Sequence, residues 1–454
     1  MIFSPAALLD CIHSTLPAGA SGTLRVAFSG GLDSTVLLAA LQRACAARPG
    51  YRLRAIHVDH GLHADSARWT VHCENVAQRL GIDFASKKVA VSPADEGLEA
   101  AARHARYAAL RECLQPGDAL LTAHHADDQF ETLMLALLRG AGLPGLAAMP
   151  ACREFAPGWH LRPLLEFTRP DLEDWARAEG LAWIDDPSND LAHFDRNFLR
   201  HQILPLLQTR WPSAVRTAVR TARHAGEGMA LLDEFAIADL ASAATGPCLK
   251  VDVLAGFSDA RRRNLLRYWS KLRGARAPST RKLLALEHDM LAAQEDRLPV
   301  IEWDGFEVRR FRGLLYGDRV RRGSSHEAVS FDWEWSRPLV LPDKLGSLHV
   351  QPGHGAGLAR ALLPRTLRVA FRQGGEVLQP AGDPHRRDLK KLLQAADILP
   401  WWRNRLPLLW VDDRLAAVGD LWTADEFAAD ADEEGVQVVW QGKPRIQAQR
   451  QTAP

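Results

Sequence analysis

A short segment, Ser29-Gly30-Gly31-Leu32-Asp33-Ser34, combines the residue types that bind phosphate groups. It lies between the apolar runs Leu24–Phe28 and Thr35–Leu41, which read as a buried strand and the start of a helix. Glycine lets the backbone adopt positive φ and approach an anion, and a helix start offers unpaired N–H groups. Asp33 would repel a polyphosphate unless a cation lay between them, and Mg²⁺ meets that need.

A glycine-rich turn whose Ser and Asp residues only cap a helix would explain any one of these residues. It does not explain the complete segment after a strand. The segment lacks the Gly-Lys-Ser/Thr ending of a Walker P-loop, which disfavours an enzyme that cleaves off the γ-phosphate. We therefore predict a phosphate-binding loop over Ser29–Ser34.

Two further polar segments lie at the ends of later apolar runs. The segment His57–His63 contains three histidines and Asp59, but no thiol lies nearby to support a zinc site, and polar capping of a strand is the alternative. The segment Thr122–Thr132 contains adjacent His124 and His125, then two acids.

The helix dipole alone would explain Asp127, but it does not explain the histidine pair. We predict that Asp128 faces Asp33 and completes an oxygen-rich Mg²⁺ site. A neighbouring histidine could then neutralise charge on a phosphate.

Strand–helix alternation positions these three segments. The repeated pattern predicts an α/β domain with a doubly wound parallel sheet, in which ligands bind beyond the carboxyl ends of the strands. The predicted strands are Leu24–Phe28, Arg54–Val58, Phe84–Val91 and Ala119–Ala123, and the predicted helices are Thr35–Leu41, Ala64–Leu80, Leu98–Leu110 and Asp127–Arg139.

The pattern changes near Trp211. A mainly helical stretch runs to about Met290, and a short β-like region follows. Gly353–Gly357 resembles a linker or loop, and a third unit contains a helical Arg387–Ala396. We predict three domains: an α/β domain at 1–212, a mainly helical basic domain at 213–350 and a small α+β domain at 365–440.

Composition limits the class of protein. The chain has 454 residues, of which 47% are hydrophobic, and its net charge is only +1. Residues 1–130 carry 12 Lys/Arg and 13 Asp/Glu, whereas residues 196–282 carry 16 and 6. This basic middle part predicts contact with a polyanion, although a solvated helical surface is the alternative.

The six cysteines form no C-x-x-C pair, which disfavours a zinc ribbon, an iron–sulfur site or a disulfide framework. The sequence shows neither a secretory signal nor the ~18 apolar residues that span a bilayer. We expect a cytoplasmic protein that does not contact a membrane.

The Ser29–Ser34 segment resembles the PP-loop of ATP pyrophosphatases, which cleave ATP between the α and β phosphates. The resemblance implies that Ser29, Gly30, Gly31, Leu32, Asp33 and Ser34 bind ATP and that His57 and Asp59 face its nucleoside. Asp33 and Asp128 would hold Mg²⁺.

Further motifs resemble the tRNA(Ile)-lysidine synthetases over nearly the whole chain. These motifs are Thr122–Thr132, Arg139–Leu146, Arg162–Leu165, Asp185–Asn189, Arg196–Arg200, Arg372–Glu376, Leu389–Leu392 and Pro400–Arg403. The resemblance implies that the wobble cytidine in the CAU anticodon of tRNA(Ile) is adenylated by ATP and that L-lysine then displaces AMP at C2.

The resemblance also suggests site residues. Asp33, His125 and Asp128 would act in catalysis. Neutralising the lysine amine, whose pKa is about 10.4, costs roughly 4–5 kcal/mol at pH 7, so His125 or Asp128 is the hypothesis for its proton acceptor. The residues predicted to contact tRNA are Arg196, Arg200, Arg386, Arg387, Lys390 and Lys391. Trp401 and Trp402 fit packing better than base stacking.

Three alternatives remain. A PP-loop tRNA thiolase would need a sulfur-carrying cysteine pair, which the chain lacks. A small-molecule synthetase would leave the basic domains without a role. A non-catalytic RNA-binding protein would bind tRNA without regard to ATP. A homodimer formed through the first domain is compatible with the sequence, but nothing in it requires one.

Overall fold

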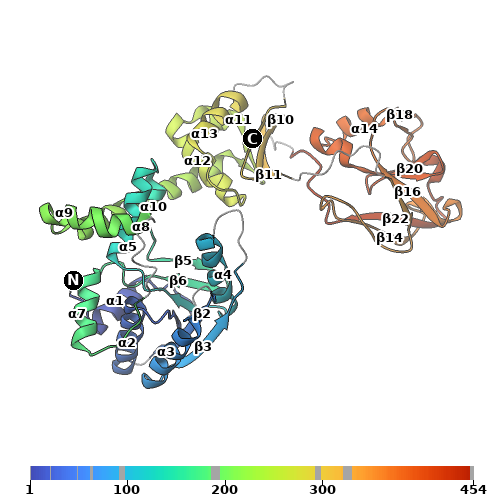
Figure 1. Ribbon diagram of the computed structural model, residues 1–454. Coiled ribbons are helices and arrows are strands. Elements are labelled where there is room, and N and C mark those ends of the chain that lie inside the picture. Colours follow the sequence, from blue (N-terminus) through green and yellow to red (C-terminus); the bar gives the residue numbers. More distant parts are fainter. Residues whose placement is uncertain are drawn as a thin grey trace. The chain divides into compact units, whose positions relative to one another are not determined.

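The computed structural model describes residues 2–20, 22–48, 50–61, 65–91, 98–185, 195–291, 298–320 and 330–449. It divides into two compact units, Met1–Leu232 and Asp233–Pro454. Each unit is described by itself (Figure 1).

A six-stranded sheet forms the centre of the first unit, in the order β3-β2-β1-β4-β6-β5. All neighbouring strands are parallel except β5, which pairs antiparallel with β6 at one edge. The strands are β1 (Thr23–Ala27), β2 (Arg52–Asp59), β3 (Asp83–Lys88), β4 (Ala119–Leu121), β5 (Cys152–Phe155) and β6 (Gly158–Leu161).

Helices cover both faces of this sheet. The helices of the unit are α1 (Pro5–Thr15), α2 (Leu32–Ala47), α3 (Ser66–Arg79), α4 (Leu98–Glu112), α5 (Ala126–Leu138), α6 (Leu143–Leu146), α7 (Arg169–Ala178), α8 (Asp195–Phe198), the π-helix Leu199–Ile203 and α9 (Leu204–Arg210). The long helix α10 (Ala214–Ala243) starts here and continues into the second unit.

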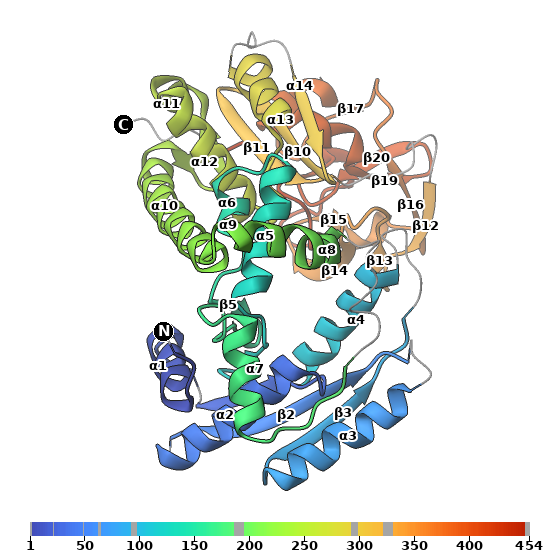
Figure 2. The same cartoon turned by 60° about the vertical axis from the view of Figure 1, so that its left-hand side comes forward.

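Alternating side chains on each strand pack into two separate hydrophobic cores, one on each face of the sheet. Leu24 and Val26 of β1 and Leu121 of β4 pack with α1, α2, α3 and α7, whereas Ile56 of β2 and Leu120 of β4 pack with α4 on the opposite face. Figure 2 shows α2 and α3 on one side of β2 and β3, and α4 on the other. The predicted doubly wound α/β class is confirmed, because both faces bury apolar residues as parallel sheets require.

The second unit begins with helices and a second sheet. Its helices are α11 (Val251–Gly256), α12 (Asp259–Leu272), α13 (Thr280–Ala285) and the π-helix Leu286–Leu291. They accompany a sheet in the order β7-β8-β11-β10-β9, made of β7 (Ala244–Thr245), β8 (Cys248–Lys250), β9 (Val300–Trp303), β10 (Phe306–Phe311) and β11 (Leu314–Arg319). The β-like region expected after Met290 is therefore part of a five-stranded sheet.

The C-terminal part is rich in strands (Figure 1, orange to red). One sheet contains β12 (Ser330–Glu334), β16 (Thr366–Phe371), β19 (Pro407–Val411), β20 (Arg414–Val418) and β21 (Trp422–Thr423). Another contains β13 (Leu339–Val340), β14 (Ser347–His354), β15 (Leu358–Ala359) and β22 (Glu434–Gln441). A two-stranded sheet, β17 (Val377–Leu378) with β18 (Arg387–Asp388), precedes the helix α14 (Leu389–Ala395), and 3₁₀-helices occupy Arg360–Leu362, Pro400–Arg405 and Asp425–Phe427.

The predicted linker or loop at Gly353–Gly357 is a loop only from Gly355 onward, between β14 and β15. Gly353 lies in β14 and pairs with Gly435 of β22. Trp402 is 7% exposed and belongs to the C-terminal core, so the prediction that it packs is confirmed. Across the residues described, no helix has both the length and the apolar character that crossing a bilayer requires.

Candidate active site

The predicted phosphate loop joins β1 to α2. The Ser29 and Ser34 hydroxyls lie 3.0 Å apart, and the Ser34 hydroxyl donates to the Gly31 carbonyl at 3.1 Å. Gly30 has φ +85°, and a Cβ there would lie 2.8 Å from the Cys73 Sγ. Gly31 caps α2 with φ −75°, so the expected positive φ holds for Gly30 and is wrong for Gly31.

His57 and Asp59 are among the last three residues of β2, and both line the same cavity as this loop. The His57 Nδ1–H donates to the Phe28 carbonyl at 2.9 Å, because a carbonyl can only accept. Burial lowers the pKa of His57, so the ring stays neutral at pH 7. The Asp59 carboxylate accepts from the Gly61 N–H at 2.8 Å, which is the strand-capping role weighed as an alternative.

The N-terminus of α5 brings His125 and two acids together. His125 caps the helix: its backbone N–H donates to the Asp128 carboxylate at 3.0 Å, and its Nδ1 accepts from the Asp127 N–H at 3.2 Å. Its Nε2 lies 3.7 Å from an Asp33 oxygen and 3.6 Å from an Asp128 oxygen. The two predicted metal-binding carboxylates therefore share one neighbouring atom.

The charge of His125 follows from these contacts. Burial lowers its pKa, but Asp128, Asp127 and Asp33 outweigh burial and raise the pKa to about 9. The Asp127 N–H can donate to Nδ1 only while the ring is neutral; once the ring is protonated, its Nδ1–H faces the Asp127 carboxylate, whose oxygen lies 3.4 Å away. The Nε2 atom carries a hydrogen in both forms, and that hydrogen faces Asp33 and Asp128.

The two acids differ in their ionisation. Burial raises the pKa of Asp33, and nearby His125 and Arg169 only partly oppose that. Burial also acts on Asp128, but His125 and Arg200 outweigh it and lower the pKa of Asp128. A buried, partly destabilised carboxylate at Asp33 is one that an added cation would stabilise.

Arg196 and Arg200, both predicted to contact tRNA, lie on a face that is turned toward α5. The Arg200 guanidinium lies 3.1 Å from the Asp128 carboxylate and 2.7 Å from the Glu131 carboxylate. Arg196 donates to the Thr132 hydroxyl at 3.4 Å. Arg200 thus already has two carboxylate partners, so its predicted contact with tRNA would require it to leave them.

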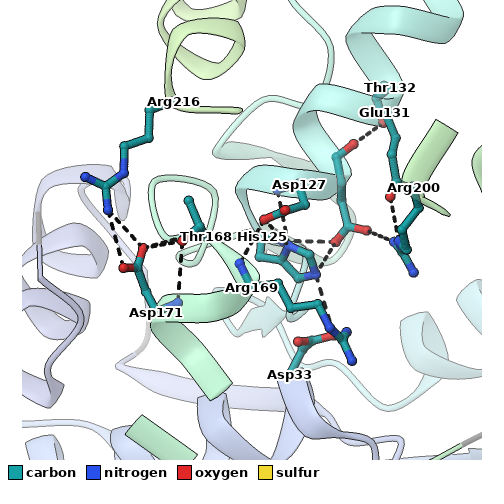
Figure 3. Close-up of polar contacts among 11 residues, drawn as sticks. Asp33, His125, Asp127, Glu131, Thr132, Thr168, Arg169, Asp171, Arg200 and Arg216 are labelled. Carbon is teal, nitrogen blue, oxygen red and sulfur yellow. Dashed lines mark hydrogen bonds and ion pairs between the residues drawn. The ribbon is translucent and has the colours of Figure 1, made fainter. Parts of the chain in front are cut away.

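Arg169, which the sequence analysis missed, also reaches Asp33. Its guanidinium lies 3.3 Å from the Asp33 carboxylate, and its backbone N–H donates to Asp127 at 2.8 Å (Figure 3). A capping box between Thr168 and Asp171 starts α7 at this residue. The sequence signal was available: a cation in the first turn opposes the helix dipole, so its placement there suggests another role.

One cavity of about 390 Å³ joins these groups. Its lining contains the predicted residues Ser29, Gly31, Leu32, Asp33, Ser34, His57, Asp59 and Asp128, and it also contains Trp69, Arg106, Tyr107, Thr122, His124, Arg169 and Asp185. Gly30 and His125 lie behind the lining. The motif residues Asp186–Asn189 and His63 lie outside the described residues.

The cavity suits Mg²⁺ that is shared with a phosphate. The Asp33 Oδ1 is buried without a hydrogen-bond partner, which leaves an oxygen free to bind a cation. Among the described residues, no group of three or more His, Cys, Asp or Glu side chains forms a ready-made metal site. Mg²⁺ commonly takes only one or two carboxylates and completes its shell with substrate phosphates and water.

The four basic residues predicted near the C-terminus occupy β18, α14 and the segment before them. Arg386, Arg387, Lys390 and Lys391 are all exposed. Arg387 lies 2.9 Å from the Asp383 carboxylate, and Lys391 lies 3.6 Å from that of Asp388.

Family models match three parts of the chain: a PP-loop domain at residues 11–207, a TilS substrate binding domain at 249–316 and a TilS substrate C-terminal domain at 367–440. Fold and site together thus define a protein of the PP-loop class, whose first domain binds ATP. The chain is 40% identical to the tRNA(Ile)-lysidine synthase of Coxiella burnetii over 96% of each chain. It is 44% identical to that of Alkalilimnicola ehrlichii, over 92% of this chain and 93% of the relative.

The chain therefore belongs to the tRNA(Ile)-lysidine synthase family. A solved structure of a U34-tRNA thiolase from Methanococcus maripaludis covers 48% of this chain and 76% of its own, with 18% identity and a TM-score of 0.39. A likeness this weak does not distinguish between activities.

Proposed function

We propose that this chain attaches L-lysine to C2 of the wobble cytidine in the CAU anticodon of tRNA(Ile). Membership of the tRNA(Ile)-lysidine synthase family supports this reaction and substrate. One observation carries the proposal: the phosphate loop, Asp33 and Asp128 line a single cavity at the carboxyl ends of β1, β2 and β4.

The reaction has two steps. O2 of the cytidine attacks the α-phosphorus of ATP, the bond to the β-phosphate breaks, and pyrophosphate leaves. The lysine ε-amine then attacks C2, AMP leaves, and the amine loses a proton. The loop of Ser29–Ser34 and the start of α2 would bind the phosphates. Mg²⁺, held by Asp33 and Asp128, would neutralise charge on the phosphate oxygens.

The proton acceptor for the amine is a separate hypothesis. Asp128 suits this role better than His125, because Asp128 lines the cavity whereas His125 lies behind it. A pKa of about 9 also keeps His125 protonated at pH 7. If changing both residues, Asp128→Asn and His125→Gln, left lysine attack on preformed adenylate unchanged while blocking adenylation, both would serve the first step alone.

We also propose that the reaction takes place in the cytoplasm, where the six cysteines, all free, would stay reduced. A homodimer through the first domain stays a prediction.

The deciding experiment measures radiolabelled lysine in tRNA transcripts supplied with ATP and Mg²⁺. We expect label in tRNA(Ile) with a CAU anticodon and little in elongator methionine tRNA, which shares that anticodon. Asp33→Asn should slow pyrophosphate release by about 100-fold or more, because it removes charge that holds the metal and phosphates.

Asp10→Asn is the matched control, since Asp10 is an exposed acid on α1. A carboxylate oxygen of Asp10 lies 3.1 Å from the Arg48 guanidinium. Its pyrophosphate release should equal that of the wild type. Equal labelling of both tRNAs would contradict the substrate assignment. Binding of tRNA that ignores ATP, with no label transferred, would support the RNA-binding alternative.

A further inference from the structure

A row of buried polar groups leads from the far side of β6 to the cavity wall. His160 of β6 is fully buried, and Thr122, which follows β4, is 8% exposed. The Thr122 hydroxyl lies 2.9 Å from the His160 Nε2 and 2.8 Å from the His124 Nδ1. None of these contacts is explained by the binding of phosphates or Mg²⁺ described above.

Two arginines determine which atoms donate and which accept in this row of hydrogen bonds. The Arg153 Nε and an Arg162 terminal nitrogen each lie 3.3 Å from the His160 Nδ1. A guanidinium can only donate, so the His160 Nδ1 must accept and cannot carry a hydrogen. Arg162 is itself held by the Pro150 carbonyl, to which it donates at 2.7 Å.

The remaining hydrogens follow in order. His160 must carry its hydrogen on Nε2 and donate it to the Thr122 oxygen. The Thr122 oxygen has a second lone pair, so the contact with His124 does not by itself fix a direction. Among the described contacts, however, the His124 Nδ1 is the one acceptor for the Thr122 hydrogen, so Thr122 donates and His124 carries its own hydrogen on Nε2. Because His124 lines the cavity, this N–H is the polar group that the ring can offer to a bound ligand.

We infer that Arg153, Arg162, His160 and Thr122 act as positioning residues that hold His124 as the neutral Nε2–H tautomer and so present an uncharged hydrogen-bond donor to the phosphates of bound ATP. The first half concerns the protein alone, and the second rests on the proposed function. Burial lowers the pKa of His160 to about 2 and that of His124 to about 3, which agrees with two neutral rings.

A neutral donor differs from an arginine or lysine in what it stabilises. It adds a hydrogen bond to a phosphate oxygen without adding a charge that would also hold the leaving pyrophosphate. A donor fixed in advance needs no reorganisation as the α-phosphorus reacts, which is the property that makes such donors effective.

The tautomer is measured in the wild-type protein labelled with ¹⁵N-histidine, with His124→Gln used to assign the signal. We expect the His124 ring to show the nitrogen shifts and couplings of the Nε2–H tautomer. This measurement needs neither ATP nor tRNA and does not depend on catalytic activity. An Nδ1–H ring or a mixture of tautomers would overturn the proposal, whatever the variants do.

The kinetic arm compares Thr122→Val with Thr122→Ser. Valine removes the hydroxyl at nearly constant shape, whereas serine keeps it. We expect Thr122→Val to lower kcat for pyrophosphate release by about 10- to 100-fold, with KM for ATP changed less than about threefold, and Thr122→Ser to stay within about threefold of wild type.

Equal rates for Thr122→Val and Thr122→Ser, whether both unchanged or both reduced, would overturn the catalytic half of the proposal. An Nε2–H ring in a wild-type protein that releases no pyrophosphate would instead contradict the proposed function and leave the hydrogen-bond row intact.

Discussion

Gly30 and Gly31 are neighbours in the phosphate loop, yet the backbone requires glycine only at Gly30. The left-handed conformation costs an ordinary residue about 1–2 kcal/mol, and a Cβ there would also press on buried Cys73. At Gly31 the nearest atoms to a Cβ lie 3.7 Å away, which is ordinary contact. We expect Gly30→Ala to lower the free energy of unfolding by at least about 1 kcal/mol.

Gly31→Ala is the matched variant, and urea unfolding should place it within about 0.5 kcal/mol of wild type. Any loss of ATP affinity in this variant would then report crowding of the phosphates. Equal destabilisation by both substitutions would contradict the different roles assigned to the two glycines.

His160 makes a second prediction at the same scale, in the pH dependence of stability. Its pKa is about 2 in the folded protein and about 6.5 in an unfolded chain. Above pH 6.5 both states are neutral. Below it only the unfolded state binds the proton, so the free energy of unfolding falls as the pH falls, by up to about 1.4 kcal/mol per pH unit.

Urea unfolding between pH 6.5 and pH 5 measures this slope. His160→Gln should reduce this slope by up to about 1.4 kcal/mol per pH unit, the contribution of one proton, even if the variant is less stable at every pH. His13→Gln, an exposed substitution on α1, should leave the slope unchanged. An unaltered slope in His160→Gln would mean that His160 is not held neutral.

At the scale of elements, α7 positions a cavity residue through its capping box. The Thr168 N–H donates to the Asp171 carboxylate at 2.9 Å, and the helix begins at Arg169, which contacts Asp33. Loss of such a cap costs about 1 kcal/mol. We expect Thr168→Ala to lower the free energy of unfolding by about that amount. It should also raise KM for ATP, because the first turn of α7, which positions Arg169, is then held less firmly.

Thr168→Ser keeps the hydroxyl and should restore both values, as measured by urea unfolding and pyrophosphate release. A normal KM in a destabilised Thr168→Ala would show that Arg169 is held by its backbone contact with Asp127 alone.

Most strands and helices of the first unit could be predicted from the sequence. Alternating apolar runs predicted β1 to β4 and their helices, because a sheet buried on both faces needs such runs. Parallel strands end at one edge, so Ser29–Ser34, His57 and Asp128 could be expected to meet there. The hairpin of β5 and β6 has strands of only four residues, too short for a periodic signal.

Side-chain partners were harder to predict. Arg169 is 136 residues from Asp33, and His160 is 38 from Thr122, so no local pattern joins them. Arg200 was predicted to contact RNA because of its charge, whereas the fold turns it toward Asp128 and Glu131.

For the whole molecule, the basic surface of the last domain should add affinity for tRNA without taking part in chemistry. Arg386 and Lys390 are exposed, and within the described residues no ion pair joins either one to a carboxylate. Each phosphate contact contributes about 0.9 to the slope of log K against log salt. We expect the double variant Arg386→Ser/Lys390→Ser to reduce that slope by up to about 2 and to weaken tRNA binding at low salt.

Adding Arg387→Ser and Lys391→Ser should lower the slope further but by less per residue, because both already pair with acids. Arg360→Ser/Arg414→Ser is the control with the same change in net charge, in residues paired with Glu434 and Glu426. Filter binding at several salt concentrations gives the slopes, and pyrophosphate release at saturating tRNA should stay at the wild-type rate in all variants. If the control shifted the slope as much as Arg386→Ser/Lys390→Ser, overall charge rather than this surface would govern tRNA binding.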